Sequence, residues 1–352
     1  MATKLGVKRV EPNLIFFLFL ILIGNRLIAA DVSLSDFVEE QNLQYSFDPF
    51  RELGQLNKGS RIISFGVGVP VFILDYALGL KVEPLYRSSD GSIRIPDQTR
   101  DVLLKVFDTS KSVSEQFNIT TIIIDPGHGG KDPGTIGTHY ISGERLQLKE
   151  KDLVLSVSKL LYSKLSNKYP DKTIKMTRST DVYLELEERT EIANSVDLGK
   201  KDAMIFVSVH ANASLNPSAS GFEVWYLPPD YRRELLDPDT LDADKKDLAP
   251  ILNSVMEEEY TVESIILAQR ILDSLDSALK GKSDNRGLKE ESWFVVRNAK
   301  MPSILIEIGF VTNKEEAQLL ARNEYLIQLS DGIYNGLVNY IDTFDSTNGF
   351  TE

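Results

Sequence analysis

The chain has 352 residues and a formal net charge of −13, with 42% apolar and 26% charged residues. This balance is typical of an ordinary globular protein. The acidic charge argues against nucleic acid as a partner, because phosphate binding requires a basic surface. The sequence has no cysteine and only three histidines, His128, His139 and His210. Disulfides and thiolate sites are therefore excluded, and any metal must be held by His, Asp or Glu.

The first thirty residues have the pattern of an export signal. Lys4, Lys8 and Arg9 form a basic start, an apolar run follows at 14–23, and small residues end the segment near Ala30. The apolar run is too short to span a bilayer comfortably. We predict that residues 1–30 are a signal peptide and that the protein is exported to the periplasm or cell envelope. The alternative, an uncleaved anchor, also places the rest of the chain outside the cytoplasmic membrane.

Residues 31–117 carry short apolar runs separated by Gly and Pro. Two such runs lie at 61–65 and 69–74, and a helical segment follows at 97–107. Short apolar runs between turn residues are typical of strands. This region is therefore predicted to be a small β-rich domain that is closed by a helix.

From Asn118 to residue 345, apolar strands alternate with amphipathic helices. Alternating strands and helices favour an α/β fold with a mainly parallel, twisted sheet that is flanked by helices on both faces. The predicted strands are 121–124, 173–177, 203–209, 221–227 and 303–308. The predicted helices begin at Lys151, cover 184–195 and include the apolar positions from Leu326 to Leu337.

Residues 228–262 have the composition of an inserted segment. Pro-rich loop residues at 228–230 and 237–239 come before apolar positions at helical spacing from Leu248 to Met256. Three acidic residues, Glu257 to Glu259, are predicted to end that helix. A second helix is predicted at 262–279.

Two of the histidines stand at the carboxyl ends of buried strands. His128 lies in Asp-Pro-Gly-His-Gly-Gly after the strand 121–124, and His210 follows the strand 203–209. In an open α/β sheet, ligands bind at this edge. Two imidazoles that converge there can hold one zinc ion. For each histidine alone, a tight turn or a structural core role is the alternative.

A catalytic zinc usually takes three protein ligands, so a carboxylate is expected as the third. Glu150 starts the first predicted helix of the α/β region, and Glu144 from the preceding loop is an alternative that spacing does not exclude. Glu307 lies inside an apolar strand, where an unpaired carboxylate is costly to bury. It is a candidate general base, and a structural ion pair with Arg297 is the alternative.

These segments together resemble the zinc-dependent N-acetylmuramoyl-L-alanine amidases, the cell-wall amidase family 3. The resemblance extends over 121–340 and rests on five motifs in order: Ile-Ile-Ile-Asp-Pro-Gly-His-Gly-Gly, Lys-Glu-Lys-Asp-Leu-Val-Leu, Glu-Arg through Ala-Asn, Ser-Val-His-Ala-Asn and Met-Pro-Ser-Ile-Leu-Ile-Glu-Ile-Gly-Phe. It implies that His128, Glu150 and His210 bind Zn²⁺ and that Glu307 is catalytic. It gives no ligand role to His139, which we interpret as a loop residue.

The resemblance implies hydrolysis of the amide bond between N-acetylmuramic acid and L-alanine in peptidoglycan, in cell-wall remodelling or daughter-cell separation. A zinc peptidase that cuts stem peptides and an inactive wall-binding protein are the alternatives. The helix near 247–259 resembles an autoinhibitory helix of cell-separation amidases, which an activator protein displaces. One acidic residue of this helix would then occupy the open zinc position, whereas an ordinary amphipathic surface helix is the alternative.

The N-terminal domain loosely resembles the amino-terminal domain of copper amine oxidases. The match begins at Leu56 and carries no catalytic motif. We expect from it neither copper nor oxidase chemistry, and a wall-binding role and a structural role both remain open.

Overall fold

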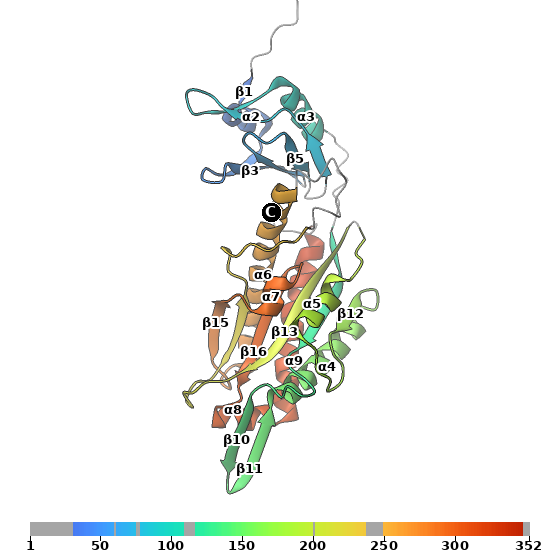
Figure 1. Ribbon diagram of the computed structural model, residues 1–352, viewed down its shortest axis with the longest axis vertical. Helices are drawn as coiled ribbons and strands as arrows, with labels where there is room; N and C mark the ends of the chain where they lie inside the picture. Colours follow the sequence, from blue (N-terminus) through green and yellow to red (C-terminus); the bar gives the residue numbers. More distant parts are fainter. Residues whose placement is uncertain are drawn as a thin grey trace, which may run out of the picture. The chain divides into compact units, whose positions relative to one another are not determined.

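The computed structural model describes residues 31–59, 61–74, 78–108, 117–199, 201–236 and 249–347. The chain divides into two compact units, Met1–Ser112 and Val113–Glu352, and each is described by itself (Figure 1). The predicted signal peptide lies outside the described residues. Among the helices within these ranges, none has the combination of length and apolar character needed to cross a membrane.

The first unit is β-rich, as predicted. Its main sheet is antiparallel and has the order β2 (Gln44–Asp48), β3 (Leu53–Lys58), β4 (Arg61–Gly66), β5 (Val71–Leu74), β6 (Leu78–Lys81). A smaller sheet has the order β1 (Val32–Ser33), β8 (Ile93–Ile95), β7 (Tyr86–Arg87). Helix α3 (Asp97–Asp108) is the predicted closing helix, whereas α2 (Leu34–Gln41) was not predicted. Their apolar side chains form one core, with Phe37, Phe72 and Leu103 fully buried.

The second unit is built on a six-stranded sheet with strand order β12-β9-β13-β16-β14-β15. Four neighbouring strands are parallel, namely β12 (Thr173–Met176), β9 (Asn118–Pro126), β13 (Asp202–Asn212) and β16 (Ser303–Phe310). Strand β14 (Phe222–Tyr226) is antiparallel to β16, and β15 (Asn285–Glu290) is parallel to β14. The predicted mainly parallel sheet is confirmed, and the carboxyl ends of β9, β13 and β16 meet at one edge.

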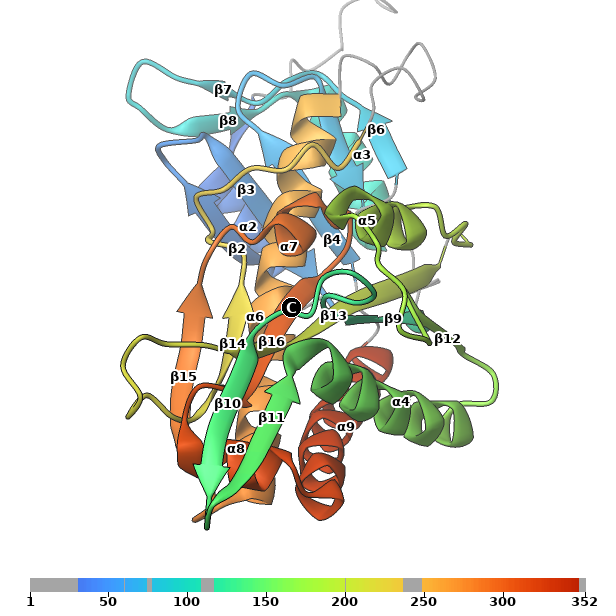
Figure 2. The same ribbon diagram turned by 60° about the horizontal axis from the view of Figure 1, so that its bottom comes forward.

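Helices cover both faces of this sheet because the side chains of its strands alternate between two cores. Ile122 and Ile124 of β9 belong to the larger core, with α4 (Glu150–Lys168), α6 (Ala249–Leu279) and α9 (Asn323–Ser346). Ile123 belongs to the smaller core, with α5 (Leu186–Asn194) and α7 (Phe294–Asn298). The short helix α8 (Lys314–Leu320) follows β16 (Figure 2). The predicted flanking helices on both faces are therefore confirmed.

The prediction of two helices at 248–256 and 262–279 is wrong, because α6 is one continuous helix over Ala249–Leu279. Pro250 stands in its first turn, where proline is tolerated. Glutamate is a good helix former, and Glu257 is neutralised by a buried ion pair with Arg233. The acidic run therefore gives no reason for the helix to end.

A β-hairpin stands where the sequence indicated a loop between the first strand and the first helix of this unit. Strands β10 (Ile136–Ile141) and β11 (Glu144–Lys149) pair antiparallel and project from the unit beside α8 (Figure 2). Gly137 passes close to the strand-end loop, because a Cβ there would lie 2.1 Å from the Val311 oxygen. This close approach anchors the base of the hairpin at the edge where β16 ends.

Candidate metal centre

The loop after β9 carries His128 in a left-handed backbone conformation, with φ of 57°. Gly127, just before it, has no room for a side chain, because a Cβ would lie 2.2 Å from the His210 ring. Gly134 is restricted in the same way, because a Cβ there would lie 2.7 Å from the carboxylate of Glu150 and 2.7 Å from the ring of His128. The glycines of this loop therefore allow its backbone to approach the side chains of the centre closely.

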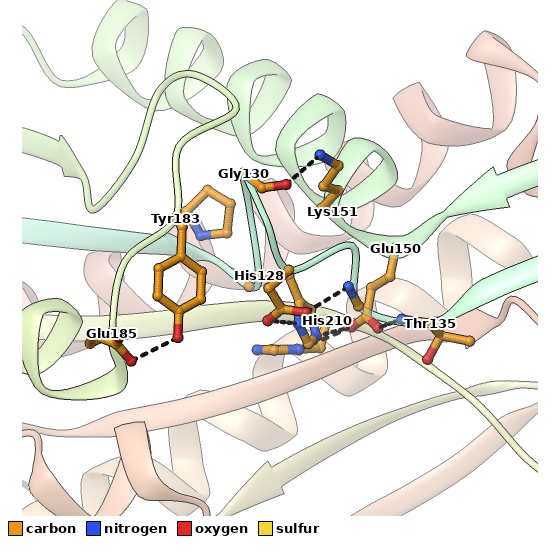
Figure 3. Close-up of polar contacts among 12 residues, drawn as sticks. His128, Gly130, Thr135, Glu150, Lys151, Tyr183, Glu185 and His210 are labelled. Carbon is orange, nitrogen blue, oxygen red and sulfur yellow. Dashed lines mark hydrogen bonds and ion pairs between the residues drawn. The ribbon is translucent and has the colours of Figure 1, made fainter.

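Glu150 is the first residue of α4, and its carboxylate lies between the two histidines (Figure 3). One oxygen, Oε1, is 3.1 Å from His128 Nε2 and 3.0 Å from His210 Nδ1. Backbone amides of Thr135 and Ala211 also donate to this carboxylate. Burial by itself would raise the pKa of Glu150, but the two imidazoles outweigh burial and hold the pKa well below its usual value. The carboxylate is therefore kept ionised.

The rings of His128 and His210 are nearly perpendicular, with centroids 5.0 Å apart and an interplanar angle of 78°. One ligand atom from each of His128, Glu150 and His210 lies within 4.8 Å of the others, so the three residues can hold one metal ion. Asp132 lies 2.7 Å from His128 Nδ1. Because a carboxylate only accepts, it fixes the proton on Nδ1 and leaves Nε2 directed at the centre.

Glu307 faces the same pocket from β16. It is the register partner of His210 on β13 and of Glu223 on β14. The pocket has a volume of about 530 Å³ and is also lined by Thr135, Asn212 and Trp293. Glu307 Oε2 is buried and has no hydrogen-bond partner among the described residues. Burial raises its pKa well above the usual value, and the charges of nearby carboxylates add to this shift.

The alternatives that the sequence left open for these glutamates do not match the structure. Arg297 stacks over the ring of Phe294, 5.2 Å from its centroid, and forms no ion pair with Glu307 among the contacts described. Glu144 is exposed at the tip of the β10–β11 hairpin, opposite Ile141. Of the two candidate carboxylates near the first helix, only Glu150 joins the histidines.

His139 does not join the centre, but its interpretation as a loop residue is wrong. It lies on β10, and its Nε2 is 2.9 Å from the backbone oxygen of Val311. The periodicity of residues 136–149 is short and interrupted by Ser142 and Gly143, which is why the hairpin was missed. His139 therefore contributes to anchoring the hairpin.

Glu257, at the acidic end of the inserted segment, also lies away from the metal centre. Glu257 is fully buried and accepts from Arg233 Nε at 2.8 Å, and neither residue lines the pocket. The hypothesis that one of these carboxylates occupies the open metal position is therefore wrong for Glu257. None of the described residues of α6 lines the pocket, and residues 237–248 lie outside the described part of the chain.

Buried charged residues that the sequence reasoning missed hold the His128 loop in place. Asp125 is fully buried and accepts from Thr177, Ser208 and Arg189. Arg189 also donates to the backbone oxygen of His128 at 2.6 Å. In the sequence, Asp125 stands directly before a Pro-Gly turn and Arg189 lies in the Glu-Arg motif, but nothing there indicates that the two residues pair.

A second buried arginine completes this support. Arg178 donates to the backbone oxygens of Pro126, Gly127 and Lys151, so that it connects the His128 loop to the start of α4. Lys151 Nζ in turn donates to the oxygen of Gly130, 2.9 Å away (Figure 3). The loop that carries His128 and the helix that carries Glu150 are thereby fixed to each other.

The second unit of the chain is similar to known proteins. The profile of the N-acetylmuramoyl-L-alanine amidase family matches residues 122–339. The N-acetylmuramoyl-L-alanine amidase AmiA of Escherichia coli is 30% identical over 240 residues, which cover 64% of this chain and 77% of AmiA. The uncharacterized protein YqiI of Bacillus subtilis is 33% identical over 229 residues, which cover 65% of this chain and 88% of YqiI.

A solved structure is similar to the same part of the chain. The crystal structure of an N-acetylmuramoyl-L-alanine amidase from Clostridium difficile is 33% identical, with a TM-score of 0.47, and the match covers 64% of this chain and 98% of that chain. The family profile matches more than half of the chain and includes the His128 loop, Glu150, His210 and Glu307. The chain therefore belongs to the N-acetylmuramoyl-L-alanine amidase family.

Proposed function

We propose that this protein is a zinc-dependent hydrolase that cuts the amide bond between N-acetylmuramic acid and L-alanine in peptidoglycan. The observation that carries the proposal is the convergence of His128, Glu150 and His210, with their ligand atoms within 4.8 Å of one another. Two imidazole nitrogens and one carboxylate oxygen are a donor set that zinc accepts in catalytic sites. The bond between Asp132 and His128 supports this assignment, because zinc-binding histidines usually donate their second N–H to a carboxylate or carbonyl.

His128, Glu150 and His210 would hold the zinc ion, which would lower the pKa of a bound water and polarise the scissile carbonyl. Glu307 faces the same pocket, and we assign to it the proton transfers of the reaction. It accepts a proton from the attacking water, whose oxygen bonds to the lactyl carbonyl carbon. It then returns that proton to the leaving nitrogen of L-alanine as the C–N bond breaks. The buried oxygen Oε2 of Glu307 has no hydrogen-bond partner among the described residues. This suits both steps, because that oxygen exchanges a proton without first losing another partner.

The experiment is hydrolysis of purified sacculi by the full-length protein, with zinc and with a chelator. We expect zinc-dependent release of intact peptides that begin with L-alanine, identified by mass spectrometry. Glu307→Gln should bind zinc but release peptides far more slowly. His139→Ala is the matched control, because His139 lies on the hairpin outside the centre, and it should retain both zinc and activity.

The same experiment separates the other candidate functions. Peptides that lack the amino-terminal L-alanine would identify a zinc peptidase instead. Binding to sacculi without any released product, in zinc-loaded protein, would identify a wall-binding protein. Release that is equal with and without the chelator would contradict the assigned metal chemistry.

We also propose that the protein is exported by the segment 1–30 and acts in cell-wall remodelling or daughter-cell separation. Regulation by an activator protein that displaces the segment 247–259 stays a prediction. Because Glu257 is held by Arg233, such regulation has to act through residues other than Glu257. Replacing 237–248 by a short Gly/Ser linker tests this idea, since an activator-dependent enzyme should then hydrolyse sacculi faster.

A further inference from the structure

The two tryptophans of the chain lie together beside the metal centre. Trp225 belongs to β14, and Trp293 stands immediately before α7. Their ring centroids are 5.8 Å apart with an interplanar angle of 83°, which is an edge-to-face pair. Such pairs are more favourable than the burial of their area alone. The arrangement therefore fixes the orientation of the outer ring as well as its position.

The inner ring is part of the protein core. Trp225 packs against the smaller core of the unit and is the register partner of Leu305 on β16. The outer ring, Trp293, is 41% exposed and lines the same pocket as Leu305 and Glu307. Glu307 lies two residues beyond Leu305, about 7 Å along the strand. Trp293 is therefore placed to meet a part of the substrate next to the scissile amide rather than the amide itself.

The chemistry around Trp293 limits what it can bind. An exposed indole offers an apolar face, which suits a ligand with one apolar face and polar edges. Glu290 and Glu291, close before Trp293 in the chain, are exposed and acidic. Lys289, Arg297 and Lys300 belong to the same stretch, so charge alone does not select the ligand. An N-acetylhexosamine ring has a rigid apolar face of C–H groups with polar edges, whereas a flexible stem peptide offers no such face.

We propose that Trp293, held edge-on by Trp225, stacks on a neutral N-acetylhexosamine ring of the glycan strand and so selects substrate in which the amide is still attached to glycan. This inference rests on the proposed function, because that function defines the two arms of the substrate, which are the glycan strand and the stem peptide on either side of the scissile amide. It makes Trp293 a substrate-binding residue and Trp225 a positioning residue.

The test is binding of neutral N-acetylglucosamine oligosaccharides as the glycan probe, because they carry no lactyl group and contain no bond for the enzyme to cut. Trp225→Phe leaves Trp293 as the sole tryptophan, and this change removes no hydrogen bond, because Trp225 Nε1 has no partner among the described residues. We expect the glycan to change the fluorescence of this variant, and the free stem peptide to leave it unchanged. Titration calorimetry should show binding about tenfold weaker or more for Trp293→Ala than for the unaltered protein.

Tyr140→Ala is the matched control, because Tyr140 is an exposed aromatic residue of the hairpin and does not line the pocket. It should bind glycan as the unaltered protein does. Trp293→Leu keeps apolar bulk at this position, so it still tests the proposal if Trp293→Ala does not fold. Both Trp293 variants should retain a cooperative unfolding transition and the zinc content while losing glycan affinity.

Equal glycan affinity in Trp293→Ala and the unaltered protein would overturn the proposal. A fluorescence response to the stem peptide instead of the glycan would overturn it as well, since the ring would then serve the peptide arm. Glycan binding that depends on Trp293 in a protein that releases no L-alanine-terminated peptides would support this inference and contradict the proposed function. Failure of this inference and failure of the proposed function can therefore be distinguished.

Discussion

Removing one partner of the buried ion pair between Arg233 and Glu257 should strongly destabilise the amidase unit. The two side chains are 3% and 0% exposed, and Nε of the arginine lies 2.8 Å from one carboxylate oxygen and 3.1 Å from the other. The backbone N–H of Arg233 donates to the same carboxylate. Arg233 also donates to the backbone oxygens of Ala299 and Met301, just before β16. The pair therefore connects α6 to the strand that carries Glu307.

The substitution Glu257→Gln keeps the volume of the side chain but leaves the guanidinium without a counter-charge. Removing one partner of a buried ion pair costs about 3–5 kcal/mol. The amide oxygen of glutamine still accepts one hydrogen bond, so a loss of about 3 kcal/mol is expected. For a unit of this size, each kcal/mol lowers the melting temperature by about 2–4 °C, which gives a decrease of about 6–12 °C.

Calorimetry of the full-length protein, together with the double variant Arg233→Met/Glu257→Met, measures this contribution. The double variant should recover most of the loss, because it replaces both charges by apolar groups of similar size. A loss below about 1 kcal/mol for Glu257→Gln would refute the reasoning. Hydrolysis per folded molecule should not increase, and an increase would mean that this carboxylate blocks the pocket after all.

Three further outcomes are expected. Glu307→Gln should lower kcat by about 10²–10⁴-fold while zinc content, measured by mass spectrometry, stays unchanged. Zinc affinity should fall as pH decreases from about 8 to about 6. Burial lowers the pKa of His128, but the neighbouring carboxylates outweigh burial and raise it, so protons compete with zinc at a higher pH than at a free imidazole. A zinc affinity that does not change with pH in a chelator competition would contradict this. Arg189→Met should cost about 3–5 kcal/mol in denaturant unfolding, because it leaves Asp125 buried without its cation. An unchanged unfolding midpoint would contradict this expectation.

The sequence was sufficient to predict the main elements around the centre. Continuous apolar runs identify β9, β13 and β16, and alternation with helices predicts their parallel arrangement, which brings His128 and His210 to one edge. The prediction that Glu150 joins the two histidines required the family resemblance, because the direction of the helix alone also allowed Glu144. The hairpin that carries Glu144 has no long periodic segment to predict it.

The remaining features depend on contacts between residues far apart in the sequence. The continuation of α6 through three glutamates follows from the partner that Arg233 offers, 24 positions earlier. Asp125 is stabilised by Arg189, 64 positions away. Neither partner can be chosen from local pattern, since the sequence contains many arginines at similar distances. Sequence reasoning therefore finds which charged residues are unusual and leaves their partners undetermined.

The register of the sheet explains why Glu307 Oε2 has no hydrogen-bond partner in the described part of the chain. His210, Glu307 and Glu223 are neighbours in one row across β13, β16 and β14. Glu223 is compensated by Arg286, at 2.8 Å, and by the side-chain amide of Asn212, at 2.6 Å. Both donors are therefore taken up by Glu223 and are not offered to Glu307. A one-residue slip between β14 and β16 would turn Glu223 to the opposite face. Burial is the main cause of the raised pKa of Glu307, and the strand register adds to it by placing the charge of Glu223 beside it.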